Sequence, residues 1–297
     1  MTFANLNLRL LAASIVLTAL TMHAARYQSG DFVFDCNYSW GELSATLLRY
    51  TGTASEVVVP SSVTFDGKEY PIIYIGDDFS APFRDNTTVQ RVTLPDHAVS
   101  VSAEAFSNCA QLAEIDLGFD LVYIGDYAFY HCPQLCRVVI HRNVAEIGER
   151  AFADCPSLTD ITLGRNVSRL GSYIFDRTPL RSMRLLGTVP ATCVGQMSSQ
   201  PSLYTDCQLT VHIGTLPAYG QDAEWSRFAH ITDRAELGDI NADGLTDVGD
   251  SNVMTNIILG RKDAAQYVAD INRDGVIDVY DSNMLINIIL GKIEVFD

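Results

Sequence analysis

The sequence has few basic residues for its acidity. It contains 20 lysines and arginines against 36 aspartates and glutamates, a formal net charge of −16. This deficit argues against nucleic acid as a partner, because phosphate binding needs a positively charged surface. Excess carboxylate suits divalent cations better, although acidity alone also keeps an exported protein in solution. With 47% apolar and 19% charged residues, the composition is that of a globular protein.

Motifs of common enzyme classes are also missing. The sequence has no Gly-x-Ser-x-Gly elbow, no phosphate-binding loop and no His-Glu-x-x-His motif. Nothing singles out a carboxylate pair for glycoside hydrolysis, although sequence alone leaves that chemistry open. We therefore expect a protein that is not an enzyme, with no catalytic residue.

Long apolar runs are scarce, and the one at the start predicts an export signal. Arg9 precedes the apolar run 10–20, and small residues follow at Ala24-Ala25, where we expect cleavage. The run is too short to span a bilayer comfortably, and no later segment is a transmembrane candidate. The first cysteine is Cys36, so a lipoprotein anchor is not indicated. The mature chain should lie outside the cytoplasm.

A sequence repeat organises the middle of the chain. Its clearest marker is a phenylalanine at every 23rd position: Phe83, Phe106, Phe129, Phe152 and Phe175. Each unit also carries a short alternating run, such as 115–117 or 161–163, in which the outer two side chains point inward. Units this small bury their apolar face only by stacking, so we expect a solenoid with a parallel strand ladder.

The repeat also explains the spacing of three of the cysteines. Cys109, Cys132 and Cys155 occupy one repeat position, which Asn86 and Thr178 fill in the outer units. We expect these three to pack as small apolar residues without cross-links. Four cysteines lie outside this series, namely Cys36, Cys136, Cys193 and Cys207, and Cys193 with Cys207 is the disulfide that we favour. Zinc binding by His131, Cys132, Cys136 and His141 is disfavoured, because the first two stand where other repeats have Asn108-Cys109 and Asp154-Cys155.

The outward positions of the strand runs form the candidate recognition face. One row reads Arg91, Glu114, Arg137, Asp160 and Ser182; the next reads Thr93, Asp116, Val139, Thr162 and Arg184. Mixed charges without aromatics disfavour a sugar-stacking platform. Extended solenoid faces generally recognise proteins. An ordinary solvated sheet face explains the same pattern about as well.

The unit Ile-Gly-x-x-Ala-Phe-x-x-Cys-x-x-Leu resembles the BspA-like branch of the leucine-rich-repeat family. The segment 57–71 resembles the lead-in to such repeats, and 209–228 resembles their closing segment, so the likeness covers residues 30–232. The resemblance implies an α/β repeat solenoid in a secreted or cell-surface bacterial protein. Caps at both ends are physically required, because terminal rungs otherwise expose the core.

A second repeat begins near Gly238 and predicts two calcium loops. Oxygen-bearing side chains recur at loop positions 1, 3, 5, 9 and 12, with a glycine at position 6 and a backbone carbonyl at position 7. The predicted ligands of the two ions are Asp239, Asn241, Asp243, Leu245 (carbonyl), Asp247 and Asp250, then Asp270, Asn272, Asp274, Val276 (carbonyl), Asp278 and Asp281. Asx-rich turns without metal are the alternative, but two copies in register favour Ca²⁺.

An apolar helix should follow each loop, because Val253, Met254, Ile257 and Ile258, and then Met284, Leu285, Ile288 and Ile289, keep helical spacing. A loop that ends in aspartate and has no entering helix resembles the type I dockerin family. That resemblance implies two packed helices and a cohesin module as partner. The residues at the family's partner-selecting positions are Val248-Gly249 and Val279-Tyr280. Many cellulosomal dockerins have small hydroxyl residues there, so the partner's identity stays open.

Together these patterns predict the following organisation: signal peptide 1–25, N-terminal β cap 26–74, repeats 75–190, C-terminal cap 191–232, linker 233–237 and dockerin-like domain 238–297. We expect an exported, non-catalytic binding or adhesion protein. Its repeats would recognise a protein, and its calcium module would dock it to a scaffold or surface. The alternative is an accessory component of a polysaccharide-degrading complex, recruited through dockerin–cohesin pairing.

Overall fold

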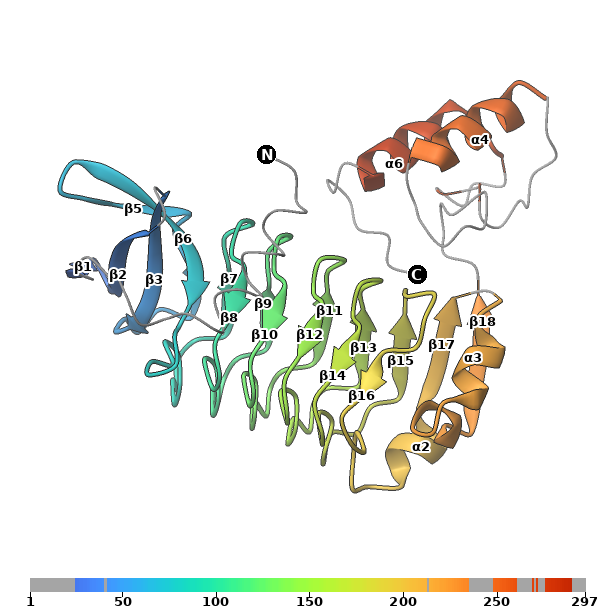
Figure 1. The fold of residues 1–297 in the computed structure, drawn as a ribbon, viewed down its shortest axis with the longest axis horizontal. Coiled ribbons are helices and arrows are strands. Elements are labelled where there is room, and N and C mark those ends of the chain that lie inside the picture. Colours follow the sequence, from blue (N-terminus) through green and yellow to red (C-terminus); the bar gives the residue numbers. More distant parts are fainter. Residues whose placement is uncertain are drawn as a thin grey trace.

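The structure is a computed structural model, and it describes residues 25–39, 42–212, 214–234, 248–260, 269, 271 and 276–289. Of the predicted signal peptide, 1–25, residues 1–24 lie outside this range. A β solenoid, in which successive coils of the chain stack in a row, forms the larger part of the fold. Two helices follow it in the chain (Figure 1). The predicted solenoid and the predicted helical C-terminal pair are therefore confirmed.

One ten-stranded sheet runs along the whole solenoid. Its order is β1-β2-β3-β6-β8-β10-β12-β14-β16, and β5 pairs with β6 beside this path. We call the parallel series from β6 to β16 the long ladder. The strands of the sheet are β1 (Ala25–Ser29), β2 (Phe32–Ser39), β3 (Glu42–Tyr50), β5 (Ser62–Phe65), β6 (Lys68–Ile75), β8 (Ser100–Val101), β10 (Tyr123–Ile124), β12 (Glu146–Ile147), β14 (Arg169–Leu170) and β16 (Thr192–Cys193).

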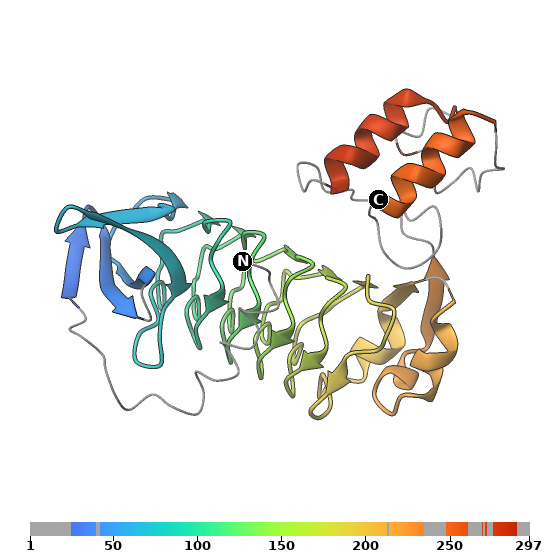
Figure 2. The same ribbon diagram turned by 45° about the horizontal axis from the view of Figure 1, so that its top comes forward.

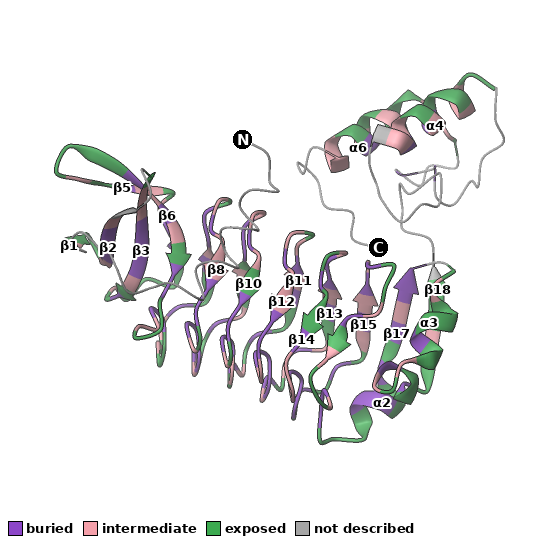
Figure 3. Cartoon of the chain, viewed as in Figure 1, coloured by how far each residue is buried: buried purple, intermediate pink, exposed green. Residues whose placement is uncertain are grey.

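The alternating triplets of the sequence form the other strands, which we call the triplet ladder. They pair in two sheets, β4-β7-β9 and β11-β13-β15-β17-β18. Their bounds are β4 (Glu56–Val58), β7 (Arg91–Thr93), β9 (Glu114–Asp116), β11 (Arg137–Ile140), β13 (Asp160–Leu163), β15 (Ser182–Leu185), β17 (Gln208–His212) and β18 (His230–Arg234). Buried and more accessible residues alternate along them, as the sequence predicts (Figure 3).

The period of the sequence sets the strand register. Tyr123 on β10 pairs with Ser100 on β8 and with Glu146 on β12, each one full repeat away. Pairing in parallel register stacks equivalent side chains of successive rungs on one another. The last repeat is one position shorter, because Asp160 pairs with Ser182. Figure 2 shows the rungs following one another along a single direction.

A column of stacked phenylalanine rings forms the centre of the core. The centroids of Phe83 and Phe106 lie 4.8 Å apart, those of Phe106 and Phe129 5.1 Å, and those of Phe129 and Phe152 5.2 Å, with interplanar angles of 10° or less. Phe175 continues the column at 6.3 Å. All five rings are buried, and burying one such side chain contributes about 1.5–3 kcal/mol. The column therefore joins each repeat to the next through the same buried side chain.

The buried cysteines donate hydrogen bonds, in addition to the apolar packing predicted from the sequence. The Sγ atoms of Cys109 and Cys132 lie 3.1 Å from the carbonyl oxygens of Phe83 and Phe106 respectively, and Cys155 repeats the contact with Phe129 at 3.2 Å. Thr178 takes the next position, and its hydroxyl donates to the Phe152 carbonyl at 2.7 Å. The position therefore favours a small side chain with a donor. A purely apolar description is incomplete.

All seven cysteines are free thiols in the structure. The favoured disulfide between Cys193 and Cys207 is therefore wrong. Cys193 belongs to β16 of the ten-stranded sheet, whereas Cys207 precedes β17 in the other sheet and is fully buried there. The two thiols thus pack on different ladders of the solenoid.

The four repeats that contain Phe106, Phe129, Phe152 and Phe175 each turn through two non-glycine residues with left-handed backbone, and the Phe83 repeat has one, Asp85. Tyr127 and His131 have φ of 57° and 56°, and the corresponding residues of the other rungs repeat these values closely. The second turn position carries polar side chains that bond to a neighbouring rung. Asn108 Nδ2 donates to Asp85 Oδ1 at 2.8 Å, and the His131 ring nitrogen lies 2.8 Å from Asp154 Oδ2. These bonds compensate for a conformation that most residues avoid.

Both ends of the solenoid are closed, at opposite ends of the row (Figures 1 and 2). At the N-terminal end the antiparallel strands β1, β2 and β3 lead into β6. At the other end lie helices α2 (Ser202–Asp206) and α3 (Leu216–Gln221) and a 3₁₀ turn, Trp225–Arg227. Trp225 is fully buried, and its Nε1 donates to the Ala191 carbonyl at 2.8 Å. The closing segment therefore covers the apolar end of the last rung.

The C-terminal repeats form helices α4 (Val248–Ile258) and α6 (Val279–Ile289), which lie side by side (Figures 1 and 2). Their core is separate from that of the solenoid and contains Met254, Ala269, Ile271 and Leu285. Met254 and Leu285 hold equivalent positions in the two repeats. The helical spacing predicted from the sequence is confirmed. Gly260 follows the first helix with φ of 67°, as a C-terminal capping glycine does.

Candidate functional site

The structure describes part of the predicted calcium site. Asp250, Val276, Asp278 and Asp281 lie within the described residues. The other predicted ligands lie outside them, namely Asp239, Asn241, Asp243, Leu245, Asp247, Asp270, Asn272 and Asp274. Among the residues that are described, no three His, Cys, Asp or Glu side chains gather around one point.

The aspartates at loop position 12 are both fully buried. Asp250 lies in the first turn of α4, and Asp281 lies in the first turn of α6. In the second loop, Asp281 Oδ1 accepts the Ile271 N–H at 2.8 Å and Oδ2 accepts the Asp278 N–H at 2.9 Å. Asp281 therefore joins the beginning of the loop to the beginning of the helix. A helix N-terminus stabilises such a carboxylate.

This arrangement fits a hard divalent cation. Burying a carboxylate is costly unless a positive charge or several hydrogen bonds compensate it. Calcium takes six to eight oxygens, and one carboxylate at the inner end of each loop supplies part of that set. The Val276 side chain is a hydrocarbon, so only its backbone carbonyl is suited to an ion, as position 7 requires.

The two helices differ in what they expose. On α6, Val279, Tyr280 and Ile286 are exposed, Tyr280 at 68%. The repeat counterparts of the last two on α4 are Gly249 and Thr255, so α4 does not repeat this apolar surface. Val279 and Tyr280 are among the residues predicted to select a partner. Ile286 was missed, although its place two helical turns after Val279 puts both on one helix face.

The outward rows of the triplet ladder lie where the sequence places them. Arg91 pairs with Glu114 across β7 and β9, with Nη2 and Oε2 2.6 Å apart. His141 Nε2 lies 4.0 Å from Asp116 Oδ1. The opposite charges of Arg91 and Glu114 therefore compensate one another across these two strands. Two further sets each share one register position, namely Arg137, Asp160 and Ser182, and Val139, Thr162 and Arg184.

The four residues considered for zinc do not come together. Cys132 is buried in the core, whereas Cys136 is exposed. His131 contacts Asp154, and the His141 ring lies 4.8 Å from the Phe119 ring. Their spacing in the sequence is explained by packing and surface contacts.

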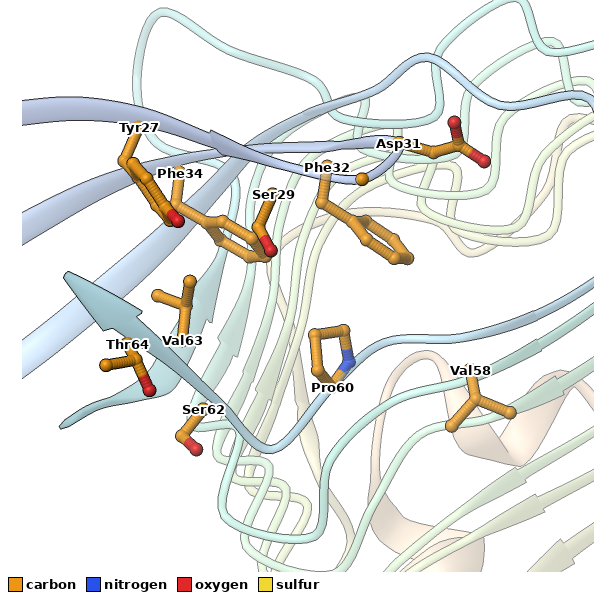
Figure 4. Close-up of a pocket in the computed structure, with 11 residues that line it drawn as sticks. Tyr27, Ser29, Asp31, Phe32, Phe34, Val58, Pro60, Ser62, Val63 and Thr64 are labelled. Atoms are coloured by element: carbon orange, nitrogen blue, oxygen red, sulfur yellow. The ribbon is translucent and has the colours of Figure 1, made fainter.

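A groove of about 500 Å³ lies in the N-terminal cap. Figure 4 shows the rings of Tyr27, Phe32 and Phe34 on one side of it and Pro60 and Val63 on the other. This groove is not evident from the sequence, because its aromatic residues come from one hairpin and its apolar floor from a later segment.

Two family models match the chain. Residues 80–192 match the BspA type leucine rich repeat region in six copies. Residues 237–290 match the dockerin type I domain. No match was found among curated proteins.

Solved structures of bacterial leucine-rich-repeat proteins have a similar fold. The pneumococcal vaccine antigen PcpA is 15% identical with a TM-score of 0.51, over 66% of this chain and 52% of that one. A leucine rich cell surface protein from Faecalibacterium prausnitzii is 22% identical with a TM-score of 0.49, over 64% of this chain and 55% of that one. A leucine rich repeat protein of T. pallidum is 25% identical with a TM-score of 0.48, over 62% and 86%. The chain thus spans about half the length of the first two.

The fold defines a class of modular repeat proteins, in which a stacked-repeat solenoid is followed by a separate pair of helices. Within that class, this chain carries a BspA-type leucine-rich-repeat region followed by a type I dockerin domain. Both are non-catalytic modules that support a protein-interaction or docking role, and dockerin type I domains bind calcium. They are typical of extracellular or surface proteins of bacteria. Among the described helices, none is long and apolar enough to cross a membrane.

Proposed function

We propose that this chain is an exported binding protein with two functional ends. The leucine-rich-repeat solenoid recognises a protein ligand, and the C-terminal domain docks the chain to a scaffold or surface partner when calcium is bound. The observation that carries the proposal is the repeated buried aspartate at the start of each C-terminal helix, Asp250 and Asp281, beside an apolar surface on α6 that α4 does not repeat. Two ions are expected, one for each loop.

The proposed role of calcium is structural. Each ion would neutralise the carboxylates of its loop and hold the loop against its helix, in the way that the Asp281 hydrogen bonds already join Ile271 and Asp278 to α6. Tyr280 and Ile286 would then stand on a fixed helix. An apolar surface on an ordered element is the usual centre of a protein interface.

Calorimetric titration of the full chain with CaCl₂ tests the metal. We expect two binding events with extracellular-type affinities of ~10⁻⁴–10⁻³ M or tighter. Asp281→Asn should remove one event and leave the other, because the substitution removes a charge and a ligand oxygen from one loop only. A wild-type titration without heat would contradict the proposal, and so would an Asp281→Asn variant that still shows both events.

A capture experiment tests the docking partner. The full chain is immobilised, and binding of a purified cohesin module is measured in Ca²⁺ and in EDTA. We expect capture only with Ca²⁺. Tyr280→Ser should lower the affinity at least tenfold, since truncated interface anchors commonly cost about 2 kcal/mol. Asn252→Ser on the exposed surface of α4 is the matched control. Equal capture in EDTA would overturn calcium-dependent docking.

The dockerin match also favours a second candidate function. A dockerin can recruit a chain to a polysaccharide-degrading complex, in which the repeats would be an accessory component. A cohesin partner that also binds glycoside-degrading enzymes would support this alternative. A partner confined to the cell surface would support adhesion instead.

A further inference from the structure

The long ladder has an outward surface of its own. Tyr74 on β6, Ser100 on β8 and Tyr123 on β10 share one register position, so their side chains point to the same side. The residue that follows each of them is fully buried, which fixes these three on the outside. Tyr74 and Tyr123 are 36% and 37% exposed. Strand spacings of about 4.8 Å place the two tyrosines roughly 10 Å apart, with only a serine between them.

A third exposed aromatic side chain follows the strand that carries Tyr74. Phe79 is 98% exposed, and it belongs to the turn that follows β6. The turn is held by Asp77, whose Oδ1 accepts the Phe79 N–H at 2.9 Å and the Ser80 hydroxyl at 2.6 Å. An exposed aromatic ring on an ordered turn is not stabilised by burial within its own chain. Such rings are common anchors for a binding partner.

Carboxylates surround the aromatic rings. Glu146 stands next to Tyr123 in register, and Asp78 and Asp126 follow β6 and β10 at the same end of the parallel ladder. Burial and then the charges of Asp126, Glu146 and Asp78 raise the pKa of Tyr123. Burial and Glu42 raise the pKa of Tyr74 in the same way. Arg169 also faces Tyr123, but its Nε is paired with Glu146 Oε1 at 2.8 Å. The surface therefore combines π faces with excess negative charge, unlike the triplet ladder, where charges pair.

We propose that this surface, formed by Tyr74, Phe79 and Tyr123 with Asp78 and Asp126, binds an arginine-bearing segment of a partner protein. A guanidinium is planar and cationic, so it can stack on a tyrosine ring and donate to a carboxylate from its edge at the same time. Ser100, which has a small side chain, separates the two tyrosines in register. Anionic partners such as nucleic acid or an acidic lipid surface are repelled.

The proposal rests on the proposed function of the repeats in protein recognition and specifies the chemistry of the ligand. The probe is a fluorescein-labelled twelve-residue peptide of alternating glycine and arginine, and binding to the full chain is measured by anisotropy. A peptide of alternating glycine and glutamate is the charge control. We expect saturable binding of the arginine peptide, weakening as salt rises, and no binding of the glutamate peptide.

Variants locate the site. Tyr123→Ser and Asp78→Asn should each weaken binding at least tenfold, whereas Tyr123→Phe, which keeps the ring, should retain most of it. Two variants are matched controls and should leave binding unchanged. Tyr280→Ser replaces an exposed tyrosine of the C-terminal domain, and Glu114→Gln replaces an acid of the triplet ladder. Circular dichroism spectra and melting curves establish that each variant is folded.

Three results would overturn the proposal: no saturable binding of the arginine peptide, equal weakening by the control variants, or binding of xylo- or cello-oligosaccharides that depends on Tyr123 in place of the peptide. Failure of the proposed function is distinguishable. If a purified protein ligand of the repeats is bound equally well by wild type and by Tyr123→Ser, this site is wrong and protein recognition by the solenoid stands. If the arginine peptide binds but no calcium uptake occurs, the docking half alone fails.

Discussion

The thiol at the repeated cysteine position acts mainly as a hydrogen-bond donor. Burial raises the pKa of Cys155 to about 12, and the pKa of Cys132 is well above its usual value through its contact with Cys109 and through burial. A thiol that stays protonated is a poor nucleophile. In contrast, Cys136 is exposed at the edge of a repeat. Reactivity should therefore differ sharply among cysteines of similar sequence context.

We predict that iodoacetamide at pH 8 alkylates native Cys136 first. Cys109, Cys132 and Cys155 should react only after denaturation, because they are buried and donate to backbone carbonyls. Peptide mapping by mass spectrometry after a timed quench measures this. Labelling of native Cys132 at the rate of Cys136 would contradict the hydrogen-bonded ladder.

The donor itself is tested by two substitutions of equal shape. Cys132→Thr keeps a donor, as Thr178 does in the last repeat, whereas Cys132→Val replaces it with a methyl group. We expect the valine variant to be less stable than the threonine variant by about 1 kcal/mol, the usual net contribution of one hydrogen bond. Urea unfolding gives the difference. Equal stability would mean that the position selects for size alone.

Asp176 gives the solenoid a pH dependence at its C-terminal end. Burial opposes its charge, but hydrogen bonds from the Ser199 hydroxyl at 2.6 Å and the Ser199 N–H at 2.8 Å, with Arg150 and Arg177 nearby, outweigh burial and lower the pKa of Asp176. Because the folded-state pKa lies below the unfolded value of about 3.9, the stabilisation is fully present above that pH. It is lost as pH falls through the folded-state pKa.

We therefore predict that urea unfolding midpoints of wild type fall between pH 5 and pH 3 by more than those of Asp176→Asn. The asparagine variant should be less stable at pH 7, and the two should converge in acid. Asp206→Asn, on the exposed end of α2, is a control that should keep the wild-type pH dependence. Parallel curves for wild type and Asp176→Asn would contradict the role given to this carboxylate.

At the scale of elements, the phenylalanine column joins each rung to the next. Truncation of one ring leaves a cavity bounded by the rings above and below, which cannot both close it. Phe129→Ala should cost about 3–5 kcal/mol in free energy of unfolding. Phe79→Ala removes a side chain of the same type that is 98% exposed and should cost almost nothing. Chemical denaturation of both variants checks the contrast, and similar losses would contradict the stacked column.

The elements that repeat large apolar residues were predictable from the sequence. The phenylalanines and the alternating triplets recur at fixed spacing, so the solenoid, its period and the outward rows of the triplet ladder followed directly. The long ladder could not be predicted in the same way, because each of its strands from β8 onward has only two residues. Its outward tyrosines, Tyr74 and Tyr123, also interrupt the period. The left-handed turns were also missed, since Tyr127 and His131 are not the glycines that such turns usually carry.

The candidate calcium site shows a similar division. Ligand spacing predicted the two loops, and the two helices followed from apolar periodicity. The hydrogen bonds from Ile271 and Asp278 to Asp281 could not be predicted, because they depend on how the loop folds back on the helix. The exposure of Ile286 likewise depends on which face of α6 the partner helix covers.

At the scale of the whole molecule, the chain has two cores without a shared residue. The core of α4 and α6 is small, so its stability should depend on bound ions, whereas the solenoid buries a continuous apolar column. We predict that EDTA lowers the melting temperature of the C-terminal domain and leaves that of the solenoid unchanged. Calorimetry or hydrogen exchange in Ca²⁺ and in EDTA tests this. Loss of both domains in EDTA, or of neither, would contradict it.

The parallel ladders also determine how this protein carries a mechanical load. Their hydrogen bonds run from rung to rung, along the row rather than across it. A chain tethered through its C-terminal domain and pulled at its N-terminal cap is therefore strained in the direction of those bonds. Strands loaded this way separate one rung at a time. We expect such a tether to lengthen gradually under tension and to absorb work at each step, so that an attachment made through it extends before it breaks.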